Sequence, residues 1–276
     1  MIDNLVPSIP DSVKEKMYED AVQPAAKQVG QIAETVVMAI NKRIEPIRRW
    51  ATYGQDNNKK LEEEIQKRLA DTPPEDIITP PKEVAIPAII ANSYTDNDTL
   101  RSLYANLLAK AMDKNAGHPH PSYVEIIKQL SPDEALLLKS TNLLKKPVPM
   151  CLLRYQKTSK FLNDEELILH PQNIIRNFKE GYNVLSYHIP QITIFNPDEL
   201  SIMIDNLLRL KLIDIPYGVH LAAKDAYIDF YKDAYVNGIQ DILEANGTIE
   251  DFEVAHVMKM ISPTPYGNIF YKICVE

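Results

Sequence analysis

Glycine and cysteine are scarce in this chain, and neither occurs in the spacing of a known site. The 276 residues include eight glycines that stand singly, so there is neither a phosphate-binding loop nor a dinucleotide-binding fingerprint. The two cysteines, Cys151 and Cys274, lie far apart and give neither a disulfide framework nor a zinc site. Free thiols, and an N-terminal segment that is acidic where an export signal is basic, predict a cytoplasmic protein.

Long hydrophobic runs and an excess of positive charge are also missing. No stretch approaches the roughly 18 uninterrupted apolar residues of a membrane-spanning helix, so we expect no membrane span. The formal net charge of -8 and the isoelectric point near 5.4 argue against tight binding to duplex DNA, which requires a positive field.

Catalytic and metal-binding patterns are missing as well. No serine lies in a nucleophile-elbow sequence, and Cys151 lies in an apolar run typical of a buried, inert thiol. His118 and His120 flank Pro119, but their spacing matches no established zinc pattern. The sequence therefore predicts no catalytic residue, no cofactor and no metal site, and a protein that is not an enzyme.

Two phrases in the middle of the chain predict a compact run of helices. They are LRSLYANLLAKAMD (100–113) and HPSYVEIIKQLSPDEALLL (120–138), in which apolar residues recur at steps of three and four. Asp96 or Asp98 is expected to cap the first helix, and Ser131 to cap the last one. His120 is expected to fix the entry of the middle helix by bonding a neighbouring carbonyl. Leu107 and Ile127 lie mid-face and are expected to meet in the core.

These phrases resemble the central signature of the bacterial abortive infection alpha family, which is linked to defence against bacteriophage. The resemblance extends to YEDAVQPAAKQVG (18–30), LLRLKLI (207–213) and PTPYGNIFYKIC (263–274). Lys211 stands where the family has a glycine, so the turn before Leu212 is expected to differ. The resemblance implies a phage-defence role and transfers no catalytic residue. The signature residues in this sequence are Leu100, Arg101, Tyr104, Asn106, Leu107, Leu108, His120, Pro121, Ser122, Tyr123, Ile127, Leu130, Ser131 and Pro132.

The N-terminal third has the pattern of a long amphipathic helix. Its apolar seam needs a partner, which is favoured to be a charged helix over 59–70 that carries Leu61, Ile65 and Leu69 and follows a loop at Gly54. A homodimer through the seam and a membrane surface are the alternatives. A proline-rich connector, 71–81, follows. The seam consists of Val22, Ala26, Val29, Ala33, Val36, Ile40, Ile44 and Ile47.

A basic stretch follows the signature, because residues 135–163 contain no Asp or Glu. It is either a surface for an anionic partner or a solvated surface around a connector. Val148 to Leu153 within it is expected to form a strand. The candidate interaction residues are Lys139, Lys145, Lys146, Arg154, Lys157 and Lys160.

The C-terminal part has the outline of a winged-helix module: a helix capped by Asn196, strands at 212–215 and 253–261, and a helix capped by Thr264. An insertion with a helix around 225–235 separates the two strands, and an extended segment is expected at 187–195. The first helix carries Asp198, Glu199 and Asp205, which repel phosphates. This favours packing or protein contacts over DNA binding.

Together these patterns predict a mainly α-helical protein in three parts. They are an N-terminal helical hairpin with its connector (1–81), a central helical core (82–146) and a winged-helix-like α+β module with insertions (147–276). We interpret it as a non-enzymatic phage-defence protein that acts through contacts with an unidentified protein partner. The alternatives are a winged-helix regulator that binds nucleic acid and a membrane-acting effector that uses the N-terminal helix.

Overall fold

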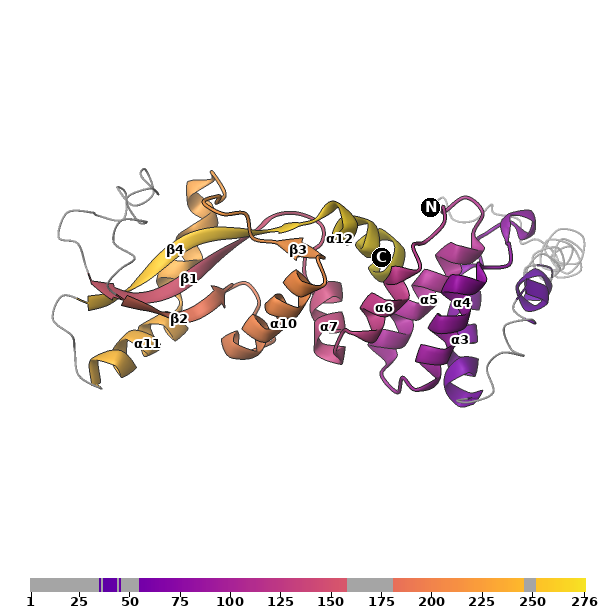
Figure 1. Ribbon diagram of the computed structural model, residues 1–276, viewed down its shortest axis with the longest axis horizontal. Helices are drawn as coiled ribbons and strands as arrows, with labels where there is room; N and C mark the ends of the chain where they lie inside the picture. Colours follow the sequence, from indigo (N-terminus) through magenta and orange to yellow (C-terminus); the bar gives the residue numbers. More distant parts are fainter. Residues whose placement is uncertain (1–34, 36, 44, 46–54, 158–180, 246–251) are drawn as a thin grey trace, which may run out of the picture. The chain divides into compact units, whose positions relative to one another are not determined.

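The computed structural model describes residues 35, 37–43, 45, 55–157, 181–245 and 252–276 (Figure 1). Within them the protein is mainly α-helical with one four-stranded antiparallel sheet, which confirms the predicted class at this level. The chain forms two compact units, Met1–Lys128 and Gln129–Glu276. The three-part division stays a prediction.

The first unit is built around α5, the helix of the first signature phrase. α3, α4 and α6 pack against it, and α4 is apolar throughout residues 84–91. Leu107 and Ile127 are completely buried, on α5 and α6 respectively, as their positions in the sequence predict. The bounds are α3 (Gln55–Arg68), α4 (Lys82–Ser93), α5 (Asp98–Met112) and α6 (Ser122–Lys128).

The start of α5 corrects the predicted cap. Asn97 is the capping residue, and its Oδ1 accepts a hydrogen bond from the backbone N–H of Leu100 at 3.0 Å. Asp98 lies in the first turn and pairs with Arg101 instead. Residues 96–98 are all of types that cap helices well. Because Asp98 is engaged by Arg101, the capping position falls to Asn97.

The N-terminal seam falls almost entirely outside the described residues. Of its members the structure describes Ile40, which is fully buried in helical residues 37–43. α3 begins at Gln55, earlier than predicted, and its stripe of Leu61, Ile65 and Leu69 is buried while the helix packs on α4 and α5. The hairpin and the homodimer through the seam therefore stay predictions.

The proline-rich connector is held to the end of α5. It contains a short 3-10 turn, η2 (Pro74–Asp76), and then runs extended. The N–H of Ile78 donates to the carbonyl of Met112 at 2.8 Å, and the N–H of Lys114 to the carbonyl of Asp76 at 2.9 Å. The connector thus becomes part of the first unit.

The second unit contains the sheet, in the order β2-β1-β4-β3 (Figure 1). β1 pairs with β4 along its whole length, from Val148 to Lys157, so it is longer than predicted. The predicted extended segment at 187–195 is largely wrong, because β2 ends at His188 and the chain then turns. The strands are β1 (Val148–Lys157), β2 (Gly181–His188), β3 (Ile213–Asp214) and β4 (Phe252–Pro263).

The helices of this unit have the predicted caps. Ser131 and Glu134 form a reciprocal capping box at the start of α7 (Pro132–Ser140). Asn196 caps α10 (Pro197–Arg209), and Thr264 caps α12 (Pro265–Phe270), which continues into the π-helical turn η4 (Tyr271–Val275). Local side-chain chemistry was sufficient to predict these boundaries.

One face of the sheet is covered by the insertion between β3 and β4. The insertion contains the 3-10 segment η3 (Lys224–Lys232) and α11 (Ala234–Ala245). The order α10, β3, β4, α12 is that of the predicted winged helix, but β4 pairs mainly with β1. The winged-helix assignment stays a prediction. The core on this face comprises Cys151, Leu153, Leu185, Tyr227, Phe230 and Val236.

The turn after α10 has a left-handed conformation of the kind that favours glycine. Lys211 has a φ of 58°, in the left-handed region. The N–H of Leu212 donates to the carbonyl of Leu207 at 3.1 Å, and the N–H of Lys211 to that of Leu208 at 3.0 Å. This is a Schellman ending, and Leu212 and Leu207 are both buried within it. The buried leucines thus hold a left-handed turn with a lysine in place, and the expectation that the turn differs from the family's stays a prediction.

Lys211→Gly is expected to stabilise the protein by roughly 0.5–1 kcal/mol, because the left-handed conformation costs an L-residue more than glycine loses in unfolded-state entropy. Urea unfolding measures the gain. Lys146→Gly, at an exposed position where φ is not positive, is the control and is expected to give none. A Lys211→Gly protein that unfolds at lower urea than the parent would contradict this account of the turn.

Candidate functional site

Two polar residues of the first signature phrase, Arg101 and Asn106, are buried between helices. Arg101 is 1% exposed, and its Nη2 donates to Asn57 Oδ1 at 3.2 Å and to the carbonyl of Thr95 at 3.0 Å. Its Nη1 pairs with Asp98. A guanidinium used in this way joins α3, the α4–α5 turn and α5, and is not available to a substrate.

A second arginine joins the other end of the same helix pair. Arg68 of α3 donates from Nη2 to Ser102 Oγ at 2.9 Å and from Nε to Asn106 Oδ1. It also pairs with Glu64 at 2.9 Å. Asn106 is 9% exposed, so this signature residue too serves the α3–α5 contact.

The second signature phrase begins at a histidine turn. His120 Nδ1 lies 2.6 Å from Ser122 Oγ and accepts a hydrogen bond from the N–H of Ser122 at 3.2 Å. Its partner is thus Ser122 and not the carbonyl that we expected, because the proline between them brings the hydroxyl into reach. Tyr104 and Tyr123 are buried, and burial, followed by the charge of Glu125, raises the pKa of Tyr104.

The two C-terminal family phrases meet each other. Thr264 donates from Oγ1 to the carbonyl of Lys211 at 2.6 Å and from its N–H to the carbonyl of Leu212 at 3.1 Å. Gly267 lies so close that a Cβ there would overlap the Leu212 carbonyl oxygen. The turn after α10 and the start of α12 are therefore one packed joint.

The basic stretch divides into exposed and buried members. Lys139, Lys145 and Lys146 are exposed, whereas the side chains of Lys157 and Lys160 lie outside the described residues. Lys145 Nζ lies 4.9 Å from the centre of the Tyr271 ring, and hydrogen bonding to the Tyr271 side chain, followed by its charge, raises the pKa of the lysine. The three described lysines remain a candidate surface for an anion.

Arg154, predicted as a candidate interaction residue, is buried in the sheet. It is 7% exposed, and it donates to Asn183 Oδ1 at 2.9 Å and to the carbonyl of Gly181 at 2.8 Å. Its guanidinium therefore joins β1 to β2 and does not belong to an exposed basic surface. Strand pairing is long-range, so a run of basic residues in the sequence gives no sign of it.

The acidic residues of α10 are exposed at Asp198, Glu199 and Asp205. The hydroxyl of Tyr187 on β2 donates to Asp205 Oδ1 at 2.7 Å. Burial, and second this bond, raise the pKa of Tyr187 to about 12. α10 is thus tied to the sheet through an acid that also gives its outer face a negative charge.

The thiols lie in the core. Cys151 and Cys274 are 0% exposed, and burial raises the pKa of both well above the usual range of a thiol. A thiol in that state is neither ionised nor accessible at neutral pH. Among the described residues, no three His, Cys, Asp or Glu side chains are placed to hold a metal ion.

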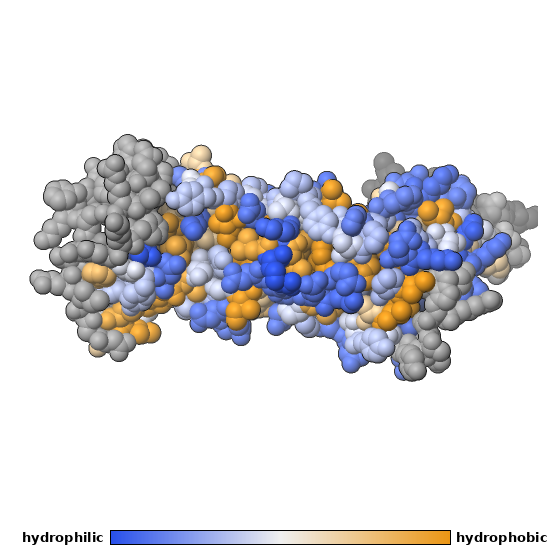
Figure 2. Space-filling view, viewed as in Figure 1, coloured by the Kyte–Doolittle hydropathy of each residue, from blue (hydrophilic) through white to orange (hydrophobic). Residues whose placement is uncertain are grey.

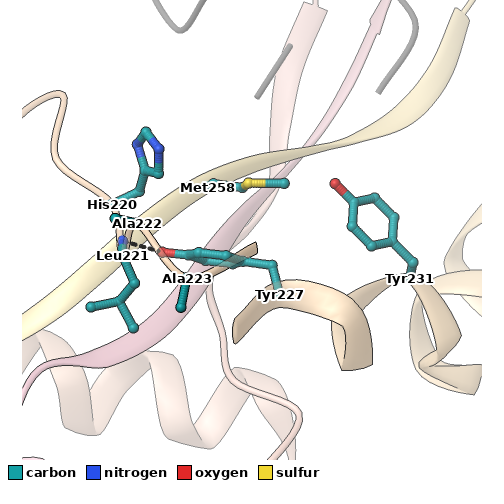
Figure 3. Close-up of a pocket in the computed structure, with 7 residues that line it drawn as sticks. All are labelled: His220, Leu221, Ala222, Ala223, Tyr227, Tyr231 and Met258. Carbon is teal, nitrogen blue, oxygen red and sulfur yellow. Dashed lines mark hydrogen bonds between the residues drawn. The ribbon is translucent and has the colours of Figure 1, made fainter. Parts of the chain in front are cut away.

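A small pocket of about 40 Å³ lies in the insertion (Figure 3). Tyr227 forms one wall; its hydroxyl accepts from the N–H of Leu221 at 3.0 Å and donates to the carbonyl of Lys259 at 2.6 Å. The hydroxyl of Tyr231 points toward Met258 (Figure 3). A cavity of this size has room for a few waters or a small apolar group, and not for a nucleotide or flavin.

The comparisons with known proteins agree with the signature. The family model described as abortive infection alpha matches residues 54–274. The chain belongs to the abortive infection alpha family. No curated protein and no solved structure matches it.

The family match begins at the first turn of α3 and ends in the last turn of the chain. It includes both pairs of phrases whose contacts are described above, so the abortive infection alpha signature coincides with the packing of this fold. Within the part of the chain that the structure describes, none of the helices combines the length and hydropathy needed to cross a bilayer.

Proposed function

We propose that this protein is a non-enzymatic, cytoplasmic phage-defence protein that acts through protein contacts. The family membership supplies the defence setting. The observation that supports this mechanism is the position of Arg101 and Asn106, the two buried polar signature residues. Their side chains join helices of the first unit, so recognition of a partner falls to other, exposed residues.

The surface offers apolar side chains for such contacts in the second unit. Four large ones lie close in sequence within the insertion and are exposed: Tyr217 by 85%, Val219 by 41%, Ile228 by 45% and Tyr231 by 41%. We call these four the insertion surface. Tyrosine is enriched at protein interfaces, and exposed apolar side chains are candidates for such contacts. Hydrophobic residues also come to the surface over α11 (Figure 2).

A nucleic-acid regulator is the second candidate, favoured by the exposed Lys139, Lys145 and Lys146 and by the winged-helix order of elements. The net charge of -8 and the acidic face of α10 oppose it. A membrane-acting effector depends on the N-terminal seam, which lies largely outside the described residues.

We expect no tight, salt-sensitive binding to duplex DNA at physiological salt, because the candidate recognition helix would present carboxylates to phosphates. Fluorescence anisotropy with a duplex, at two salt concentrations, measures it. Strong binding would contradict this expectation. If it is lost in the Lys145→Ala/Lys146→Ala double variant but kept in Lys59→Ala/Lys60→Ala, the protein would instead be a regulator that binds nucleic acid.

The defence role is tested by phage challenge. Bacterial cells that produce the chain are expected to give fewer plaques than cells that produce Leu107→Asp, in which a charge in the core prevents folding. A panel of unrelated phages is needed, because the trigger is unidentified. Equal plaque numbers across the panel would contradict the defence role.

A further inference from the structure

His188 is buried at the end of β2, where several elements surround it. Its side chain is 2% exposed, and its Cα pairs across the sheet with Cys151 of β1. The edge of its ring meets Phe230 of η3, with the centroids 5.7 Å apart. Its face stacks on Tyr235 of α11 at 6.0 Å. A titratable ring thus occupies the contact between the sheet and the insertion.

Asp233 connects this histidine to the first turn of α11. Its Oδ2 lies 3.0 Å from His188 Nε2, while its Oδ1 accepts the N–H of Tyr235 at 2.9 Å. Its carbonyl accepts the N–H groups of Val236 and Asn237 at 3.2 and 3.4 Å. One residue therefore caps the helix and holds the histidine, so a change at the imidazole reaches α11 directly.

We propose that His188 and Asp233 form a pH-sensitive latch, which keeps α11 on the sheet at neutral pH and releases it on acidification. In the closed state the neutral imidazole presents Nε2 to the carboxylate between two aromatic rings. A second proton makes the imidazole a cation that has lost its hydration in this buried site, and the Asp233 carboxylate offsets that loss only in part. Release of α11 returns the imidazole to water, where the charge is solvated.

The groups around His188 determine the direction of the effect. Burial lowers its pKa, and the charge and hydrogen bond of Asp233 oppose this only in part. On α11, burial and then the charges of Asp198 and Asp233 raise the pKa of Tyr235, so that ring stays neutral. On β1, Cys151 stays a thiol because burial raises its pKa. Among the described residues, Asp233 is therefore the charge that His188 meets.

The lowered pKa of His188 in the closed state determines how the closed population changes with pH. The closed state binds the proton less readily than the open state, in which the pKa of the imidazole is near its ordinary 6.5. The closed state is thus favoured above that pH and loses its advantage below it, by up to about tenfold in population per pH unit. Release would uncover Val236 and the apolar core that it covers. The latch does not depend on the proposed defence role.

Hydrogen exchange of the full chain at pH 7.5 and 5.5, corrected for the intrinsic pH dependence of exchange, tests the latch. The amides of Tyr235, Val236 and Asn237 are expected to lose protection at pH 5.5 relative to those of α5. In His188→Gln, which keeps an amide donor and cannot titrate, the difference between the two pH values should disappear. His118→Gln replaces an exposed histidine and should behave as the parent.

Unchanged protection of α11 in the parent, or an equal loss in His188→Gln, would overturn the latch. Should His188→Gln fail to fold, the titration of the His188 ring protons by NMR in the parent decides the question. A midpoint below 6.5 that coincides with the loss of α11 protection supports the latch. A midpoint at or above 6.5 refutes it.

Discussion

Leu107→Ala is expected to lower the free energy of unfolding by roughly 2–5 kcal/mol, the cost of deleting a completely buried leucine side chain and leaving a cavity. Leu107 lies on α5, which packs against α3, α4 and α6, so the surroundings have little freedom to collapse into the space. Urea unfolding followed by circular dichroism measures the loss.

Ile127→Ala on α6 should show a loss of similar size, because Ile127 is 1% exposed. Ile90→Ala is the matched control: it removes the same atoms from α4 of the same unit, where the side chain is 46% exposed. We expect the control to change stability by much less. Equal unfolding midpoints for Ile127→Ala and Ile90→Ala would show that the core has been misassigned.

Gly267→Ala is expected to cost about 1–3 kcal/mol or more, because the added methyl would overlap the carbonyl oxygen of Leu212. Backbone faces backbone at this joint, so neither side can give way by changing a rotamer. The Thr264 bonds to Lys211 and Leu212 would lengthen together as α12 moved away.

Gly238→Ala in α11 is the matched control for that substitution. A Cβ at position 238 meets nothing within 4 Å, and alanine favours the helix over glycine. We expect Gly238→Ala to leave the melting temperature unchanged or raise it, and Gly267→Ala to lower it. A Gly267→Ala protein as stable as the parent would refute the close joint between the two family phrases.

Features set by neighbours in sequence were predictable, and those set by distant contacts were not. Ser131, Asn196 and Thr264 cap their helices because the acceptor and the amide are three residues apart. Asn97 was missed in favour of its acidic neighbours, since the pairing of Asp98 with Arg101 could not be weighed in advance. β2 lies earlier in the sequence than the extended segment predicted at 187–195. Its position depends on pairing with β1, from which it is distant in sequence, and no local pattern reveals that pairing.

The candidate site was predicted less well than the fold. Arg154 is buried in a strand pair, which no local signal reveals, while the exposed Lys139 and Lys145 follow the expected pattern. His188 and Asp233 were not singled out at all. They come together only because η3 and α11 fold back onto the sheet, and neither residue lies in a recognisable motif.

The family signature acquires a physical meaning from these contacts. Arg101 and Asn106 were recognised as signature residues, and their buried bonds to α3 and its neighbours explain why those residue types suit those positions. A buried, hydrogen-bonded arginine is costly to replace, since its partners would be left without a donor. In this account the signature specifies the fold, and the defence role belongs to the surface.

The most direct test of that account is a plaque count on cells that produce one of three folded variants. Tyr217→Asp changes the insertion surface, Tyr94→Asp changes a similarly exposed tyrosine at the C-cap of α4, and Cys151→Ala removes a buried thiol. Circular dichroism confirms that each variant is folded. Action through protein contacts predicts that Tyr217→Asp loses protection while the other two keep it. Loss of protection in Cys151→Ala, with Tyr217→Asp fully protective, would contradict the account.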